Sequence, residues 1–192
     1  RQMAEGESSP DSNARYNLQE AEKNGVKLGV YFFSTAISQE EAVEEADWTA
    51  DFIAQYPITY PVVYDCEGFT DTESRQYGMS KTERTDIALA FLKRIEQRGY
   101  EGMFYAAKNE LQDETLWETS RIEKHYKIWV AQFPGDADPA VHTSSYTGEH
   151  QMWQYTMEGS VPGISQPVDM NVAYFGYDGV EKPKDETPPA EA

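Results

Sequence analysis

Apolar residues recur along the chain with two different periods, and the two alternate through the first two thirds of the sequence. Short apolar runs predict strands at residues 26–33, 60–69 and 102–106, whereas apolar residues spaced three and four apart predict helices between them. Two of these helices begin at Ser-x-x-Glu capping boxes, at Ser38 and Ser80. Strands that alternate with helices are typical of βαβ units and a parallel sheet.

The last third of the chain has a different pattern. A short helix is predicted over residues 109–119, and the strands that follow have little helix between them. A regular eight-fold barrel is therefore not expected, and the sequence predicts an α/β fold of the irregular (β/α) TIM-like barrel type over residues 1–180. Residues 181–192 lack core-forming side chains and are expected to be a disordered tail or linker. The later strands are predicted at residues 127–133, 150–156 and 168–172.

The apolar run at residues 60–69 ends in two carboxylates. Side chains alternate along a strand, so Val63, Asp65 and Glu67 are predicted to share one face, with the two acids about 6.5–7 Å apart at the backbone. Barrel enzymes keep their chemistry at the carboxyl ends of parallel strands, and a paired Asp and Glu suits glycosidic bond cleavage. For the D-x-E pair alone, the alternative of a turn-capping Asp and a solvent-exposed Glu stays open.

Composition narrows the function classes. The 192 residues carry a net charge of −18, which argues against nucleic acid or an anionic membrane as a partner. Aromatic residues make up 13% of the chain, which suits both sugar stacking and an ordinary core. Cys66 is the only cysteine, so no internal disulfide is possible. The three histidines lack metal-ligand spacing and are expected at the surface or in loops, and neither a metal nor a cofactor is expected.

Four segments, in order and at fitting intervals, resemble family 25 of the glycoside hydrolases, the muramidases (lysozymes) of bacteria and phages. They are A-E-K-N-G-V-K-L-G-V-Y-F-F from residue 21, P-V-V-Y-D-C-E from residue 61, I-W-V-A-Q-F from residue 128, and residues 151–171 with M-W-Q-Y-T, G-S-V-P-G-I and V-D-M-N. The resemblance implies a peptidoglycan hydrolase that cleaves between N-acetylmuramic acid and N-acetylglucosamine, with retention and acetamido participation. It also implies a monomer that acts outside the cell or at the cell wall.

The resemblance assigns roles to particular residues. Glu67 is expected to be the general acid/base and Asp65 its ionised partner, and Asp169 of V-D-M-N is expected to line the same cleft unless it is a turn residue. Aromatic and amide side chains at or near strand ends could stack on sugars or bond to their polar groups. These further substrate-binding candidates are Tyr31, Tyr105, Trp129, Trp153, Tyr155, Gln132 and Gln154. Any one aromatic could equally belong to the core, but at least two are expected to face the cleft.

One part of the family pattern has no match. The family opens with a strand of the type Gly-hydrophobic-Asp-hydrophobic-Ser, whereas residues 1–6 look like the end of its second strand. The resemblance therefore predicts a sheet with one open edge, lacking a strand and helix of roughly 30 residues. Two other functions stay open, namely a non-catalytic peptidoglycan-binding barrel and a glycosidase that acts on chitin-like chains, which share N-acetylglucosamine.

Overall fold

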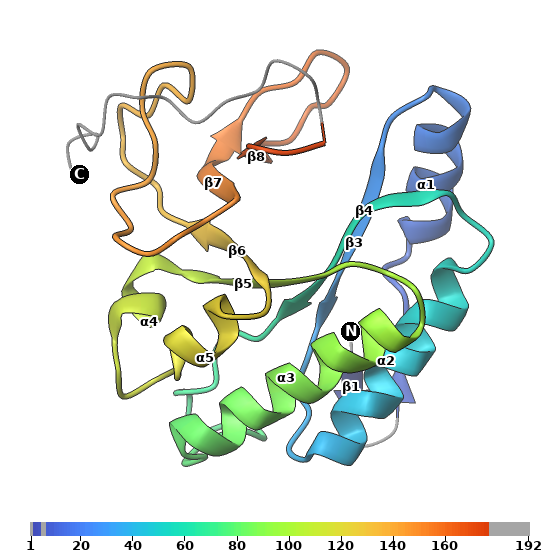
Figure 1. The fold of residues 1–192 in the computed structure, drawn as a ribbon. Helices are drawn as coiled ribbons and strands as arrows, with labels where there is room; N and C mark the ends of the chain where they lie inside the picture. Colours follow the sequence, from blue (N-terminus) through green and yellow to red (C-terminus); the bar gives the residue numbers. More distant parts are fainter. Residues whose placement is uncertain (1, 5–6, 177–192) are drawn as a thin grey trace. The chain divides into compact units, whose positions relative to one another are not determined.

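The computed structural model describes residues 2–4 and 7–176, so the predicted tail at residues 181–192 lies outside the described residues (Figure 1). The chain divides into two compact units. The N-terminal unit comprises Arg1–Phe104 and Glu114–Tyr126, and the C-terminal unit comprises Tyr105–Asp113 and Lys127–Ala192. In chain order the elements are β1 (Gln2–Ala4), β2 (Glu7–Ser8), α1 (Ala14–Lys23), β3 (Leu28–Phe33), α2 (Gln39–Ile53), β4 (Ile58–Asp65), α3 (Lys81–Gln97), β5 (Gly102–Ala107), α4 (Lys108–Gln112), α5 (Thr119–Glu123), β6 (Lys127–Ala131), β7 (Met152–Gly159) and β8 (Val168–Ala173).

Six strands form a mixed sheet in the order β3-β4-β5-β6-β7-β8, and β1 and β2 form a separate antiparallel pair. The β3–β4 and β6–β7 pairs are parallel, whereas β8 runs antiparallel to β7. This arrangement confirms the predicted fold class, an α/β fold consistent with an incomplete β/α barrel. Among the described strands, β3 stands at one end of the sheet order, where the sequence predicts an open edge. The β1–β2 pair was not predicted, because strands of two and three residues leave no periodic pattern.

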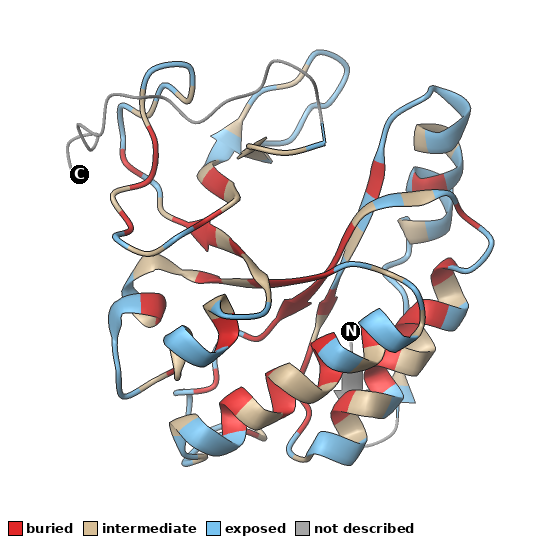
Figure 2. Cartoon of the chain, in the orientation of Figure 1, coloured by how far each residue is buried: buried red, intermediate tan, exposed pale blue. Residues whose placement is uncertain are grey.

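An aromatic core lies between the strands of the N-terminal unit and two of its helices. Phe32 of β3 pairs in register with Tyr64 of β4, and both rings pack on Phe91 of α3, with centroids 5.9 and 5.3 Å away. Tyr64 also stacks on Phe104 of β5 at 6.1 Å. Figures 1 and 2 show α2 and α3 side by side, with their buried residues toward the strands and exposed residues outward. The helices therefore cover the face that carries Phe32 and Tyr64.

The capping boxes place the starts of both covering helices. Ser80 accepts a hydrogen bond from the backbone N–H of Glu83, and the Glu83 carboxylate accepts one from the backbone N–H of Ser80, so the predicted box is complete. Ser38 caps α2 in the same way by accepting from the N–H of Glu41. The Glu41 carboxylate instead accepts from the N–H of Ile37 and bonds to an arginine, so only half of the box expected at Ser38 forms.

The helix predicted over residues 109–119 is wrong, because two short helices, α4 and α5, flank an irregular segment there. Trp117 in this segment is buried, and its ring packs edge-on against Phe104 at 4.9 Å. The buried Arg84 donates to the carbonyl of Leu116, and the N–H of Glu118 donates to the hydroxyl of Thr85. Side chains of α3 therefore take the backbone groups that a continuous helix would have used, which local sequence pattern cannot reveal.

Gly29 allows β3 to approach β4 closely at the one irregularity in their register. A Cβ added there would lie 2.8 Å from the Cβ of Tyr60 and 3.1 Å from the carbonyl oxygen of Pro61. We predict that Gly29→Ala lowers the free energy of unfolding by about 1–3 kcal/mol, because the strands must separate to admit the methyl group. Urea unfolding of this variant, with the exposed Val26→Ala as the control, checks the prediction. An unchanged midpoint for Gly29→Ala would contradict it.

Candidate functional site

Asp65 is the last residue of β4. It pairs in register with Phe33 of β3 and lies on the same face as Val63, opposite the Tyr64 side chain that enters the helix-covered core. Asp65 is buried, with 7% of its surface exposed. The strand was expected to include Glu67, but β4 ends at Asp65 and Glu67 lies exposed in the irregular segment that follows. Asp65 and Glu67 therefore do not lie on the same strand.

The segment after β4 turns sharply. Gly68 has a φ of +69°, a left-handed conformation that glycine adopts without steric cost. Phe69 then returns to the core, where its ring packs edge-on against Trp117 at 5.4 Å, with the guanidinium of Arg84 4.0 Å from the ring centroid. Glu67 is thus presented at the surface by a turn that is anchored on its far side by a buried aromatic residue.

A buried carboxyl supports the loop after β3, next to Asp65. The N–H of Ser34 donates to the carbonyl of Asp65 at 2.7 Å, and the Ser34 hydroxyl donates to Glu45 Oε2 at 2.6 Å. Burial raises the pKa of the Glu45 carboxyl from its ordinary 4.5 to about 7, although hydrogen bonds from Ser34 and the Thr35 N–H oppose this rise. Glu45 was not among the residues predicted for the site. Its spacing from Ala42, Ala46 and Thr49 on the buried stripe of α2 is the signal that could have found it.

Two predicted aromatic residues come together with two amides in the C-terminal unit. The rings of Tyr105 and Trp129 meet edge to face with centroids 4.8 Å apart. The Tyr105 hydroxyl donates to Gln154 Oε1 at 2.8 Å, and the Trp129 indole donates to Asn171 Oδ1 at 3.0 Å. Gln154 and Asn171 are register partners on β7 and β8. We call these four residues the aromatic–amide cluster. Asn171 was not among the predicted site residues, although it ends the V-D-M-N motif.

Asp169 lies two residues before Asn171 on β8 and is exposed. Alternation along the strand puts its side chain on the same side of the sheet as Asn171. Asp169 is thus two residues from one member of the aromatic–amide cluster on the same strand. On β3, Tyr31 is likewise exposed, with 64% of its surface accessible, and it lies on the face of Val63, its register partner.

The remaining candidates have structural partners. Trp153 is fully buried and donates its indole N–H to the carbonyl of Gln132 at 2.9 Å, so its ring has no surface for a sugar and we assign it to the core. The Gln132 amide oxygen accepts from the Ser144 hydroxyl and the Ser145 N–H, and its nitrogen donates to the Ser145 hydroxyl. The Gln132 amide thus fixes the loop that contains Ser144 and Ser145. Tyr155 is half-buried against Trp153, with centroids 5.7 Å apart.

His150 was expected at the surface or in a loop; it precedes β7 in a loop but is buried, with Nε2 3.2 Å from the Thr143 hydroxyl. Within residues 2–4 and 7–176, no cluster of three His, Cys, Asp or Glu side chains could hold a metal ion. No helix in that same part of the chain is long and apolar enough to cross a membrane.

Each unit, taken by itself, carries side chains of a kind that suits a sugar polymer. The N-terminal unit presents a carboxylate at a strand end and another two residues later, and the C-terminal unit presents aromatic rings fixed by amides. A family model described as glycosyl hydrolases family 25 matches residues 2–164. This chain belongs to that family. The match confirms the resemblance stated from the four sequence segments, and it spans residues of both units. A search of curated proteins found no significant match.

Solved structures support the same family fold. The modular autolysin LytC from Streptococcus pneumoniae is 26% identical with a TM-score of 0.68, and the match covers 85% of this chain but 38% of LytC. A bacterial lysozyme from Streptomyces coelicolor is 23% identical with a TM-score of 0.69, covering 90% of this chain and 79% of the lysozyme. The spore cortex lytic enzyme SleM of Clostridium perfringens is 21% identical with a TM-score of 0.67, covering 88% and 56%. At the lower identities, the likeness shows the fold alone.

The raised pKa of Glu45 predicts a pH dependence of stability. Below pH 4.5 both the folded and the unfolded chain hold this proton, so stability is unaffected. Between pH 4.5 and about 7 only the folded chain keeps it, so the free energy of unfolding falls as pH rises, and the loss is complete above about 7. We expect Glu45→Gln, which mimics the neutral acid, to remove this loss.

Urea unfolding at pH 4 and pH 8 measures the effect. Relative to the unaltered chain, Glu45→Gln should be nearly neutral at pH 4 and more stable by up to roughly 3 kcal/mol at pH 8, from about 1.4 kcal/mol per pKa unit. The neighbouring Glu44 is exposed, so Glu44→Gln is a matched control that should show no such difference. An equal effect of Glu45→Gln at both pH values would contradict the prediction.

Proposed function

We propose that this chain is a muramidase, a peptidoglycan hydrolase that cleaves the β-1,4 bond between N-acetylmuramic acid and N-acetylglucosamine. The observation that carries the proposal is the Asp65–Glu67 pair at the carboxyl end of β4 in a chain that belongs to glycosyl hydrolases family 25. A solved LytC complex holds a synthetic peptidoglycan ligand, which supports the same substrate class here. The chain covers less than half of LytC, so the proposal concerns this domain alone.

The two acids differ in exposure, and this difference suits two roles. Glu67 is exposed, so it can reach a glycosidic oxygen, protonate it as the bond breaks, and later accept a proton from water. Asp65 is buried at the strand end, where an ionised carboxylate could orient the substrate's acetamido N–H. The acetamido oxygen would then attack the anomeric carbon from the opposite face, and water would open the resulting ring, so the configuration is retained. This scheme belongs to the substrate-assisted exceptions among glycosidases.

The aromatic–amide cluster supplies features that a glycan strand requires. Sugar rings present C–H groups that pack on aromatic faces, and their hydroxyl and acetamido groups bond to amides. Tyr105 and Trp129 are half-buried, so part of each ring stays accessible, and Asp169 adds an exposed carboxylate on β8. We assign substrate contacts to these three residues, and a lesser role to Tyr31, Tyr155, Gln132 and Gln154, the last of which is buried and bonds to Tyr105. The place of action proposed is the cell wall outside the cell, and the acting form is a monomer.

Glu67→Gln tests the proposed general acid/base. Gln keeps the shape of Glu but cannot deliver a proton, so we predict a loss of roughly 10²–10⁴-fold in kcat on purified peptidoglycan, with wall binding retained. Glu73→Gln, which alters an exposed acid in the loop that follows, is the matched control and should leave kcat within twofold. Reducing-sugar release and co-sedimentation with cell walls measure the two quantities.

The same assay separates the proposed function from its alternatives. A muramidase gives fragments with N-acetylmuramic acid at the reducing end, which mass analysis identifies. A non-catalytic binder would sediment with the wall but release no reducing sugar from the unaltered chain. A glycosidase for chitin-like chains would act on N-acetylglucosamine oligomers instead of peptidoglycan. Activity of Glu67→Gln within twofold of the unaltered chain would remove Glu67 from the mechanism.

Trp129→Ala tests the aromatic contact. We predict a rise in KM of roughly 2–10-fold with kcat little changed, because an aromatic contact is worth about 0.5–1.5 kcal/mol and tenfold in affinity is about 1.4 kcal/mol. Phe133 follows the end of β6 and is 40% exposed, so Phe133→Ala is the matched control, with KM expected to stay within a factor of two. Equal KM values for the two variants would contradict the assignment of Trp129.

A further inference from the structure

The exposed turn that carries Glu67 lies between two buried residues. Cys66 and Phe69 are each 1% exposed, whereas Glu67 and Gly68 between them are exposed. Because β4 ends at Asp65, the sheet hydrogen bonds do not fix this turn. The direction of the Glu67 carboxylate therefore depends on the contacts that fix Cys66 and Phe69, the buried residues on either side. Phe69 is held by Trp117 and Arg84, as described above.

Gln76 fixes Cys66, the buried residue that precedes the turn. Its side chain is buried, with 1% of its surface exposed, although glutamine is usually a surface residue. The Cys66 thiol donates to Gln76 Oε1 at 3.1 Å, and Gln76 Nε2 donates to the carbonyl of Ala36 at 2.8 Å. Burial raises the pKa of the Cys66 thiol to about 12, so the thiol keeps the proton that it donates. One amide thus joins the segment after β4 to the loop after β3.

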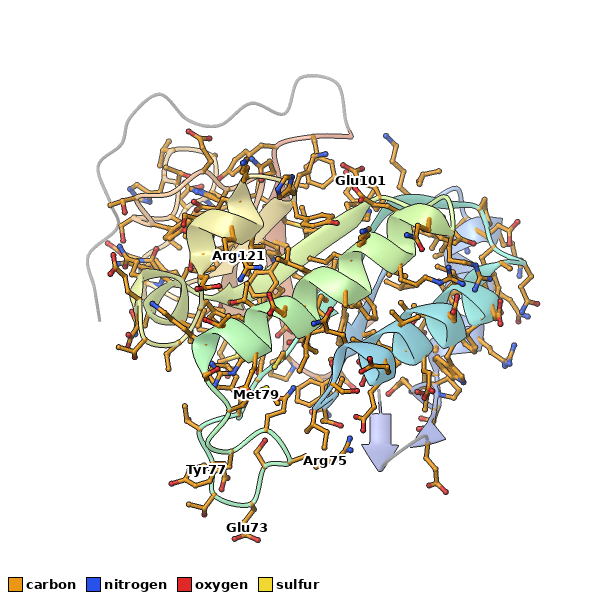
Figure 3. The ribbon with its side chains drawn as sticks, turned by 60° about the horizontal axis from the view of Figure 1, so that its bottom comes forward. Glu73, Arg75, Tyr77, Met79, Glu101 and Arg121 are labelled. Carbon is orange, nitrogen blue, oxygen red and sulfur yellow. The ribbon has the colours of Figure 1, made fainter. Side chains whose placement is uncertain are left out.

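Arg75 makes a parallel connection at the surface. Its guanidinium donates to both carboxylate oxygens of Glu41, at 3.0 and 3.1 Å, and to the carbonyl of Thr35 at 3.1 Å. Figure 3 shows the loop between β4 and α3 extending beyond the start of α3, with Arg75 on the side toward α2 and with Glu73 and Tyr77 directed away. Two consecutive residues, the partly exposed Arg75 and the buried Gln76, therefore attach this loop to the loop after β3.

We propose that Gln76 is a positioning residue for hydrolysis, which fixes the Glu67 carboxylate by holding Cys66 against the loop after β3. This inference rests on the proposed function. A misplacement of about 1 Å in a reacting group can cost roughly 10²-fold in rate, so a residue without substrate contact can control kcat. The hydrogen bonds from Tyr105 to Gln154 and from Trp129 to Asn171 do not include this amide, so we expect its loss to leave substrate binding at the aromatic–amide cluster unchanged.

The test compares Gln76→Met, which keeps the length of the side chain but removes both hydrogen bonds, with Gln39→Met at an exposed position in the first turn of α2. We expect Gln76→Met to lower kcat on peptidoglycan by at least tenfold with KM within twofold, and Gln39→Met to change neither. Each variant is assayed below its own unfolding temperature, so that loss of folded protein does not lower the rate. An unchanged kcat for Gln76→Met, or a change in KM alone, would overturn the inference.

Two variants of Cys66 distinguish positioning from general damage to the core. Cys66→Ser keeps a donor for Gln76 Oε1 and should retain kcat within threefold, whereas Cys66→Ala should lose at least fivefold. Combined with Gln76→Met, Cys66→Ala should cost little more than Gln76→Met alone, since both remove the same hydrogen bond. Fully multiplicative losses, or an equal loss for the serine and alanine variants, would count against the hydrogen bond as the cause.

Failure of the proposed function would look different. In that case the unaltered chain would release no reducing sugar from any wall, and the kinetic comparison would have no reference. Amide hydrogen exchange at Glu67 and Gly68 then decides the inference. Exchange at least tenfold faster in Gln76→Met than in Gln39→Met supports the positioning of this turn, and equal exchange overturns it.

Discussion

The packing of Phe32 and Tyr64 against α3 is the interaction on which the rest of the N-terminal unit depends. Register pairing puts these two rings side by side, and their burial under the helices fixes which face of β3 and β4 is the core face. A shift of one residue in either strand would turn every side chain to the opposite face. Because Tyr64 points into the core, the next residue, Asp65, points to the opposite face of the sheet. The aromatic core beneath the strand therefore helps to place this acid.

Beyond the ends of β3 and β4, hydrogen bonds of buried polar side chains fix the chain, in place of aromatic packing. Glu45 holds Ser34, and Gln76 holds Cys66 and Ala36, all in the loops that follow β3 and β4. Apolar side chains would bury these loops at lower cost, since a buried polar group must have every hydrogen bond satisfied. Hydrogen bonds, however, fix direction, and packing among apolar side chains tolerates small shifts. A loop that must hold a reacting group in one orientation therefore benefits from buried amides and carboxyls.

Much of the fold follows from local pattern. The spacing of Ile87, Phe91 and Ile95 predicts the buried face of α3, and Ser80 predicts its start, because both signals arise within one helix. The end of β4 could not be predicted in this way. Alternation continues through Glu67 in the sequence, but Gly68 turns the chain and Phe69 is drawn back to Trp117, a residue almost fifty positions later. Contacts over that separation override local preference.

The site shows the same division between local and distant causes. Asp65 and Glu67 could be proposed as site residues because a strand-end D-x-E pair carries its signal in three consecutive residues. Gln76 and Asn171 were missed because each acts through a partner about forty positions away in the chain, Ala36 and Trp129 respectively. Trp153 was taken for a sugar-binding residue because a sequence cannot distinguish a buried indole from an exposed one. Candidates for the chemistry can thus be proposed from residue type and position, whereas residues that would orient them through distant contacts become visible only when the packing is known.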